Sequence, residues 1–268
     1  MKEKHLKEKE KRLTVLLIIR IILSIIILSC IVYIFLWFQE NQKNAKILSQ
    51  VTDESVVGTT YVEVPVENPT EENQQEETIK IPVYELNFEK LLSINNSTMG
   101  WITVPNTSIN YPVVKATNND FYLNHSFDKS QNTAGWIFAD YRNSFDGNDK
   151  NIIIYGHNRM DSSMFATLKN TQKANWYNNP DNKYISFSTP DTNHVYEVFS
   201  VYTIKMEGYY LTTVFNNDAE YLDFLNTLKN RSIHDFGVNL TAEDNILTLS
   251  TCDATGKSRV ILHAKQIL

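Results

Sequence analysis

The chain carries two cysteines, and one of them stands where an apolar run ends. Cys252 follows the run Asn245–Thr251, "NILTLST", and Arg259 comes seven residues later. The other cysteine, Cys30, lies far away within a long apolar segment, so the two cannot pair in one chain. Outside the cytoplasm an unpaired cysteine is a partner in an intermolecular bridge, a free reactive thiol or a small buried apolar residue.

Alternation along this run favours the reactive thiol. Successive side chains of a strand point to opposite faces, so Leu247 and Leu249 share one face while Thr248, Ser250 and Cys252 share the other. The cysteine therefore belongs to the polar face. A thiol attacks as the thiolate, and because its ordinary pKa of about 8.5 leaves a small ionised fraction at neutral pH, it needs a basic neighbour.

Histidine is the usual basic neighbour of a catalytic thiol. His157 directly follows the apolar run Asn151–Gly156, at a point where a loop leaves a rigid strand. His263 is the local alternative, since it lies in the run that begins at Arg259. Spacing alone does not choose between them, and we favour His157 for its position. The remaining histidines of this part of the chain are expected at the surface: His125, His194 and His234.

Arg259 begins the β-rich run Arg259–Ile267, just after the short stretch "DATGKS". If this run pairs with 245–251, Arg259 comes close to Cys252, where a guanidinium could stabilise an oxyanion during acyl transfer. An ordinary surface arginine is the alternative. Other chemistries lack support: two cysteines cannot form a CxxC zinc site, and none of the eight glycines makes a phosphate-binding loop.

Strands must position these groups. Eight short runs rich in β-branched and aromatic residues follow one another, bounded by Asn, Pro, Gly and Asp, and this spacing predicts a closed or nearly closed β-barrel. Pro112 in the second run indicates an edge or bulged strand. The runs are Trp101–Val104, Ile109–Lys115, Gly135–Arg142, Asn151–His157, Lys183–Thr189, His194–Ile204, Asn245–Thr251 and Arg259–Ile267.

Three helices are expected beside the strands. The longest, Asn217–Arg231, has apolar residues at helical spacing, and Asn217 can cap it with Glu220 three residues on. It lies between two late strands. Leu86–Asn95 is expected to lead into the barrel as an N-terminal helix, and Ser162–Asn170 is a short candidate. The fold class is therefore mainly β.

The N-terminus predicts a membrane anchor. Residues 1–12 hold six Lys and Arg against three Glu, and residues 13–38 are apolar apart from Arg20. A helix of about 20 apolar residues crosses a bilayer, and the basic flank places residues 1–12 in the cytoplasm and the rest outside. A cleaved signal peptide is the alternative, but the apolar run is long and no small-residue cleavage site follows it.

Residues 39–85 are rich in Glu, Gln, Asn and Thr, which predicts an extended, poorly ordered stalk. The helix of the anchor is expected to continue into its first residues. The net charge of −6 comes largely from this stalk and gives no support for nucleic-acid binding. Residues 86–268 remain for one globular domain, a size that supports a single core.

The motifs together resemble a known family. "TLSTC" at the end of a strand, an arginine opening the next strand and "YGH" after an apolar run are similar to the sortases, membrane-anchored cysteine transpeptidases of Gram-positive bacteria. The helix inserted between late strands and the N-terminal helix resemble class B in particular. Three further stretches carry the same resemblance: "INYPVVKATNNDFYLNHSF", "IFADYRN" and "NIIIYGHNRMDSSMFATL".

The resemblance implies a transpeptidation in the cell wall, without a cofactor or metal. Cys252 would attack the threonine carbonyl of a C-terminal sorting signal of the NPxTN or PxTG type and form a thioacyl-enzyme. The acyl group would pass to an amine of the peptidoglycan cross-bridge or lipid II, or to a pilin lysine. His157 would act as general acid and base, and Arg259 would stabilise the oxyanion. The groove would be lined by Asn119, Leu123, Tyr210, Leu211 and Ser250.

The chain departs from the family pattern at two points. The loop "DATGKS" is short, which reduces the wall beside Cys252, and Asp253 stands where the family often has a glutamate. Two other functions stay open on the residues alone. The acyl-enzyme of a cysteine peptidase would go to water, and a membrane-tethered binding module would need no turnover.

Overall fold

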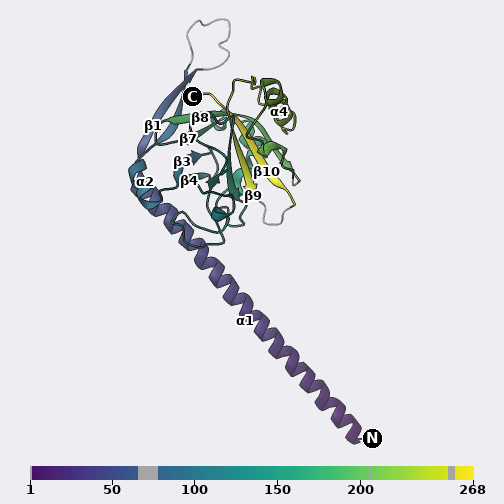
Figure 1. The fold of residues 1–268 in the computed structure, drawn as a ribbon. Coiled ribbons are helices and arrows are strands. Elements are labelled where there is room, and N and C mark those ends of the chain that lie inside the picture. The colour runs from purple at the N-terminus through teal and green to yellow at the C-terminus, as the bar shows by residue number, and fades with distance from the viewer. Residues whose placement is uncertain (1, 66–77, 206, 253–256) are drawn as a thin grey trace. The chain divides into compact units, whose positions relative to one another are not determined.

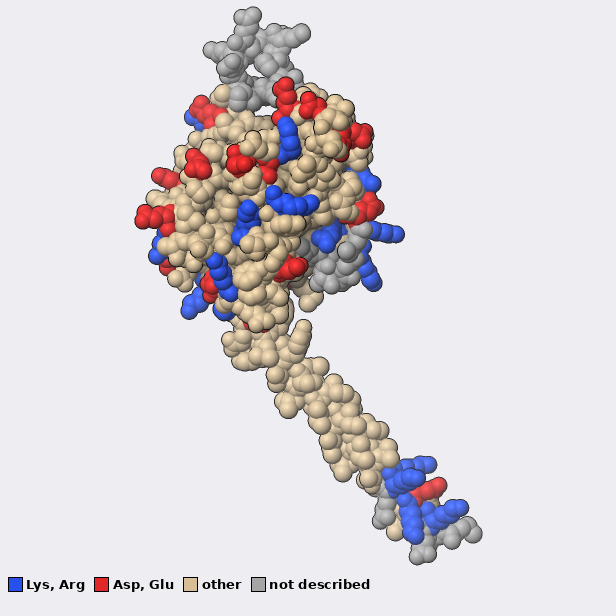
Figure 2. Space-filling view, viewed as in Figure 1, with Lys and Arg blue, Asp and Glu red and all other residues tan. Residues whose placement is uncertain are grey.

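The computed structural model describes residues 2–65, 78–205, 207–252 and 257–268. The chain divides into two compact units, Met1–Lys46 and Ile47–Leu268. Helix α1 (Lys2–Ser55) makes up the first unit, and its last residues belong to the second. Figure 2 shows Lys and Arg side chains gathered at the N-terminal end of α1, followed by a stretch without charged side chains on that face. By length and composition α1 can cross a membrane.

Residues 47–65 and 78–85 are not the poorly ordered stretch that their composition predicts. After α1 ends at Ser55, β1 (Val56–Pro65) and β2 (Thr78–Leu86) form an antiparallel pair. In β2 the apolar residues Ile79, Ile81 and Val83 alternate with exposed ones. This period-two pattern is the one that places the apolar side chains of a β-strand on a single face. The acidic residues 66–77 lie outside the described part of the chain. The limits 39–85 for a separate linker stay a prediction.

Eight strands form a closed mixed barrel, as predicted (Figure 1). The order around it is β10-β8-β7-β3-β4-β5-β6-β9, in which β4–β5 and β6–β9 are parallel and the other pairs antiparallel. β5 is shorter than its predicted run. The strands are β3 (Thr98–Thr103), β4 (Asn110–Lys115), β5 (Phe138–Ala139), β6 (Asn151–His157), β7 (Tyr184–Ser188), β8 (Asn193–Ile204), β9 (Ile246–Cys252) and β10 (Arg259–Gln266).

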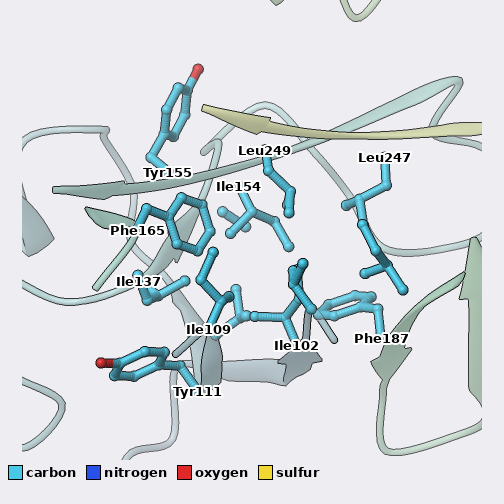
Figure 3. Packing of buried hydrophobic residues seen from close by; sticks show 14 of the residues in the cluster. Ile102, Ile109, Tyr111, Ile137, Ile154, Tyr155, Phe165, Phe187, Leu247 and Leu249 are labelled. Atoms are coloured by element: carbon cyan, nitrogen blue, oxygen red, sulfur yellow. The ribbon is translucent and has the colours of Figure 1, made fainter. Parts of the chain in front are cut away.

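The barrel interior is filled from every side by apolar residues. Leu247 and Leu249 of β9 point into it with Ile154 of β6, Ile102 of β3 and Phe187 of β7 (Figure 3). All five are fully buried. Burying one such side chain contributes about 1.5–3 kcal/mol, so the inner face fixes how β9 faces the core.

The outer face of β9 is buried as well. Thr248 and Ser250 are fully buried although they point away from the barrel interior. A second apolar cluster, which includes Tyr210, Tyr221 and Leu225, covers this part of the barrel. The predicted alternation along β9 is thus confirmed for Leu247 to Ser250, but its polar face is packed rather than open.

The position of Pro112 corrects the expectation of an edge strand. β4 pairs with β3 on one side and β5 on the other, so it lies within the closed barrel. The ladder irregularity lies in β3, between Thr98 and Gly100. Proline has no N–H to donate to a neighbouring strand. On the β5 side this costs nothing, because β5 pairs with Val114 and Lys115 and not with Pro112.

The first and last predicted helices are confirmed as α2 (Phe88–Ile94) and α4 (Asp218–Asn230). The middle one is displaced, because Ser162 and Met164 adopt left-handed φ angles of 63° and 55° that a right-handed helix cannot contain. The 3₁₀ helix η2 (Ala166–Gln172) begins after them. The other short helices are η1 (Phe121–Leu123), α3 (Ala174–Tyr177), η3 (Pro180–Asn182) and η4 (Tyr209–Leu211).

The N-terminus of α4 is capped from both sides. The Asn217 side chain accepts a hydrogen bond from the Glu220 N–H at 2.9 Å, and the Glu220 carboxylate accepts from the Asn216 N–H at 2.9 Å. These bonds satisfy backbone donors that a helix start leaves unpaired. The apolar face of α4 packs Tyr221, Leu225 and other residues onto the barrel.

Replacing Asn217 by alanine is expected to lower the free energy of unfolding by about 1 kcal/mol, because the cap is lost. Asn226→Ala is the matched control: Asn226 is exposed in the middle of the same helix, where alanine costs nothing. Urea unfolding of the full chain in detergent micelles, followed by circular dichroism, measures both. An equal loss in the two variants would contradict the role of the cap.

Candidate active site

The predicted nucleophile and base meet through the pairing of β6 with β9. These strands are parallel neighbours, in register from Asn151 opposite Ile246 to His157 opposite Cys252. Both runs therefore end together at one rim of the barrel. The structure describes the backbone of Cys252, and this backbone is the register partner of His157. Residues paired in register stand side by side in a sheet, so the backbones of the two residues meet at this rim.

Two glycines allow the close packing around His157. A Cβ at Gly156 would lie 2.5 Å from Ile137 Cδ1 and 2.6 Å from Phe165 Cγ. Gly135 has a φ of 60°, and a Cβ there would lie 2.8 Å from His157 Cδ2. Both positions exclude a larger residue. Gly156 lets β6 pack closely against Ile137 and Phe165. Gly135 lets the loop before β5 approach the edge of the imidazole.

A backbone carbonyl orients the imidazole. His157 Nε2 lies 2.7 Å from the Leu123 carbonyl oxygen. A carbonyl oxygen only accepts, so Nε2 carries the proton and donates it in this hydrogen bond. Nδ1 is then the nitrogen through which the ring can exchange a proton with a neighbour. Leu123, predicted from the sequence as a groove residue, thus contacts the predicted base through its main chain.

Arg259 lies beside the end of β9, as predicted. β9 and β10 pair in antiparallel fashion, with Ile261 opposite Ser250. The Val260 N–H donates to Thr251 Oγ1 at 2.9 Å, which extends the contact toward the rim. Arg259 Nη1 donates to the Thr251 carbonyl at 3.4 Å. Its guanidinium therefore contacts the residue immediately before Cys252, at a position suited to a developing negative charge.

His263, the local alternative, is enclosed in the outer layer. It is fully buried, with Nδ1 2.9 Å from Thr248 Oγ1 and Nε2 2.9 Å from the Tyr202 hydroxyl. Burial lowers its pKa to about 3. A neutral imidazole with both nitrogens hydrogen-bonded and no solvent access cannot serve as a proton shuttle for β9. His263 is a structural residue.

The three other histidines of this part of the chain, His125, His194 and His234, are partly exposed at the surface. His125 stacks on Phe121, and its Nδ1 lies 2.6 Å from the Phe121 carbonyl oxygen. His234 stacks on Tyr177 with ring centroids 4.2 Å apart. Burial lowers the pKa of His194. In each case the ring is partly exposed to solvent and partly covered by the protein.

Two predicted groove residues, Tyr210 and Ser250, contact each other directly. The Tyr210 hydroxyl lies 3.0 Å from Ser250 Oγ, and both side chains are fully buried. As they lie here, they support the wall beside β9 and do not face solvent. Leu211, the next residue along η4, is half-buried.

A buried carboxylate joins Asn119 to Leu211, and sequence reasoning missed it. Asp140 is fully buried and accepts from Asn119 Nδ2 at 3.0 Å, the Tyr155 hydroxyl at 2.7 Å and Arg142 Nε at 2.8 Å. Arg142 Nη2 also donates to the Leu211 carbonyl at 3.0 Å. Burial alone would raise the pKa of Asp140, but these hydrogen bonds, above all from Arg142, lower it to about 2. The available signal was the acid and arginine two positions apart in "IFADYRN".

The arrangement offers nucleophilic chemistry. The backbone of Cys252, an oriented imidazole and a guanidinium lie at one rim. Acyl transfer through a thioester uses a thiol, a base and a cation of this kind. Within the described residues, no cluster of three or more His, Cys, Asp or Glu side chains could hold a metal ion.

Comparison with known proteins identifies the fold and the family together. Residues 102–267 match the family model of the sortase domain. The chain belongs to the sortase family. Sortase B of Listeria monocytogenes is 37% identical over 181 residues, which are 66% of this chain and 72% of that protein. The predicted resemblance to class B is thereby confirmed.

Solved structures of sortase B agree with this fold. The crystal structure of sortase B from Bacillus anthracis in complex with AAEK1 has a TM-score of 0.70 at 31% identity, covering 86% of this chain and 99% of that one. The Staphylococcus aureus sortase B–substrate complex has a TM-score of 0.64 at 38% identity, covering 67% and 84%. The barrel described above is thus the sortase barrel.

Stability should depend on pH through His263. The ordinary pKa of 6.5 falls to about 3 on folding, so only the unfolded chain binds this proton between those values. The folded state therefore loses stability as the pH falls below about 6.5, by up to about 1.4 kcal/mol per pH unit. Asp140 adds to this decline only below about pH 4, because its pKa of about 2 replaces an ordinary value of 3.8.

His263→Gln removes the titrating group and should flatten the decline between pH 6 and pH 4 by about one proton's slope, about 1.4 kcal/mol per pH unit. Urea unfolding of both proteins at several pH values gives the two slopes. The test compares how the free energy of unfolding changes with pH in the two proteins. Its absolute value is not compared, because the variant also loses packing. Parallel slopes would show that the buried imidazole is already protonated when folded.

Proposed function

We propose that this sortase is a cysteine transpeptidase that cleaves a C-terminal sorting signal after threonine and transfers the protein to a cell-wall amine. The observation that carries the proposal is the register of β6 and β9, which makes His157 the partner of Cys252. Arg259, which contacts the Thr251 carbonyl, supplies the third group. Membership of the sortase family supports the same reading.

In the first half-reaction the Cys252 thiol gives its proton to His157 Nδ1, and the resulting thiolate attacks the threonine carbonyl carbon. The carbonyl π electrons move onto oxygen, and the Arg259 guanidinium stabilises the resulting oxyanion. The tetrahedral intermediate collapses and the C–N bond breaks. His157 gives its proton to the leaving amine, which departs with the C-terminal fragment and leaves a thioester on Cys252.

In the second half-reaction an amine replaces the thioester. The incoming amine attacks the acyl carbon, His157 removes its proton, and the C–S bond breaks to restore the thiolate. The hydrogen bond from His157 Nε2 to the Leu123 carbonyl holds the ring through both steps, so that Nδ1 carries the exchanged proton. One peptide bond is broken and one amide is formed, with no net hydrolysis.

The donor substrates are surface proteins with a sorting signal of the NPxTN or PxTG type. Asn119, Leu123, Tyr210, Leu211 and Ser250 are the proposed groove residues. Asn119 bonds to Asp140, Leu211 to Arg142, Tyr210 to Ser250 and Leu123 to His157, and these hydrogen bonds support the grouping. A sortase B from Staphylococcus aureus has been solved as a substrate complex, which supports a groove in the same barrel.

The acceptor is an amine of the peptidoglycan cross-bridge or of lipid II. The apolar segment 13–38 of α1 would span the membrane once, with residues 1–12 in the cytoplasm and the catalytic domain 86–268 outside. The basic N-terminal flank supports this orientation. Residues 39–85 would connect the anchor to the barrel and keep the enzyme at the membrane, where the acceptor is assembled.

Turnover of a fluorogenic sorting peptide should depend on all three residues. Cys252→Ala should abolish cleavage, His157→Gln should lower kcat by about 10²–10⁴-fold, and Arg259→Gln by about 10²–10³-fold. His234→Gln is the matched control, since this half-buried histidine packs against Tyr177. The full chain in detergent micelles is assayed with and without triglycine as amine acceptor.

Cleavage that survives Cys252→Ala would refute the assigned nucleophile. Mass spectrometry of the products separates the remaining possibilities: a triglycine adduct supports transpeptidation, whereas a free carboxylate at every triglycine concentration shows a peptidase. A pilin-derived lysine peptide in place of triglycine tests for a pilin-polymerising enzyme. No turnover of either signal type by the folded wild-type chain would leave a binding module.

A further inference from the structure

Asp140 holds a negative charge inside the protein, next to the proposed active site. Its carboxylate is fully buried and accepts hydrogen bonds from three side chains and from the Arg142 N–H at 3.0 Å. One of the donors, Tyr155, lies on β6 two positions before His157 and pairs in register with Ser250, two positions before Cys252. The buried charge is therefore fastened to the strand that carries the proposed base.

Arg142 extends this contact to the other side of the site. Its Nε and Nη2 each lie 2.8 Å from a different oxygen of Asp140, a two-pronged ion pair. The same Nη2 lies 3.0 Å from the Leu211 carbonyl in η4. A planar guanidinium can hold a carboxylate at two points and still donate outward, which an ammonium cannot do.

The opposite end of the chain of bonds is Asn119, in the loop between β4 and η1. Its Nδ2 donates to Asp140 at 3.0 Å, and its Oδ1 accepts from the Tyr141 N–H at 3.0 Å. Asn119 and Leu211 belong to segments far apart in the sequence, and both are proposed groove residues. Asp140 and Arg142 lie between them and bond to both.

We propose that Asp140 and Arg142 are a positioning pair that sets the spacing between the two walls of the peptide groove, Asn119 on one side and Leu211 on the other. The inference rests on the proposed function, because it assigns these walls to the sorting peptide. Neither residue of the pair contacts the Cys252 backbone or the His157 ring in a described interaction. Their loss should therefore weaken peptide binding and leave the chemical step intact.

A second buried ion pair offers a matched control. Lys183 pairs with Glu197 where β7 pairs with β8, and the exposed fraction of its side chain, 37%, equals that of Arg142. Glu197 is nearly as buried as Asp140. The pair contains none of the five proposed groove residues. If lost stability alone raises KM, variants of both pairs should show the rise. If lost groove spacing raises KM, only variants of Asp140 and Arg142 should show it.

The test compares Arg142→Lys and Asp140→Asn, singly and combined, with Lys183→Gln and Glu197→Gln. Each full chain in detergent micelles is assayed with a fluorogenic Asn-Pro-Gln-Thr-Asn peptide and triglycine. Arg142→Lys should raise KM about tenfold with kcat within about twofold, the loss of one charge-assisted hydrogen bond expressed as binding. The double variant should be no worse than Asp140→Asn alone, because the two residues act as one unit.

A second readout separates positioning from damage to the chemistry. The rate of Cys252 alkylation by iodoacetamide, measured across pH, reports thiolate formation. It should match the wild type in all of these variants. Arg142→Lys keeps the charge on a partly exposed side chain, so it tests the inference even if Asp140→Asn does not fold.

Three results would overturn the inference. An unchanged KM in Arg142→Lys, an equal rise of KM in the Lys183 and Glu197 variants, or a fall of kcat with an altered alkylation profile would each do so. In all three the wild type still makes the triglycine adduct, so the proposed function stands. A wild-type chain that turns over neither this peptide nor one of the PxTG type refutes the proposed function, and the groove spacing with it.

Discussion

The parallel pairing of β6 with β9 is the constraint on which the site depends. Each strand is apolar on its inner face, and burial of residues such as Leu249 and Ile154 fixes which side faces the barrel. A slip of one residue would turn that set outward, so the register is strongly specified. The same register makes His157 the partner of Cys252. The geometry of the proposed chemistry is therefore a by-product of core packing.

Residues outside the barrel hold β6 and β9 in place through buried hydrogen bonds. Thr248 Oγ1 donates to Asn151 Oδ1 at 2.7 Å, and Asn151 Nδ2 donates to the carbonyls of Tyr210 and Thr212 at 3.1 and 2.9 Å. The segment that leads to α4 is thus bonded to β6 and β9 by groups buried under it. Such networks rigidify when every member is satisfied. The inserted helix, which at first looks peripheral, covers the bonds that hold this wall.

Much of the fold was readable from local patterns. The predicted run Asn151–His157 coincides with β6, and the cap at Asn217 with the start of α4, because alternation and capping are local properties. The β1–β2 hairpin was hidden by its polar composition, since alternating Ile79, Ile81 and Val83 sit among Glu and Thr. The average hydrophobicity of a segment says nothing about the order of its residues. A segment that is polar on average can therefore still alternate apolar and polar residues as a strand does.

The site was readable only in part, for the same reason. The histidine, cysteine and arginine stand at strand ends and could be selected by type and position. Asp140 and Arg142 could not, because their importance comes from contacts with Tyr155 and Leu211 that only the closed barrel creates. His263 has the residue type of a catalytic partner, and only its burial shows that it is structural.

The place of β9 in the barrel also determines when the site can exist. β9 lies between β6 and β10, and β10 follows it in the sequence. The barrel cannot close before β10 is synthesised, and pairing over such long sequence separations is slow. Before β9 takes its place beside β6, Cys252 lacks its register partner His157. A chain that is incomplete, or still emerging, therefore lacks the strand pairing on which the proposed chemistry depends.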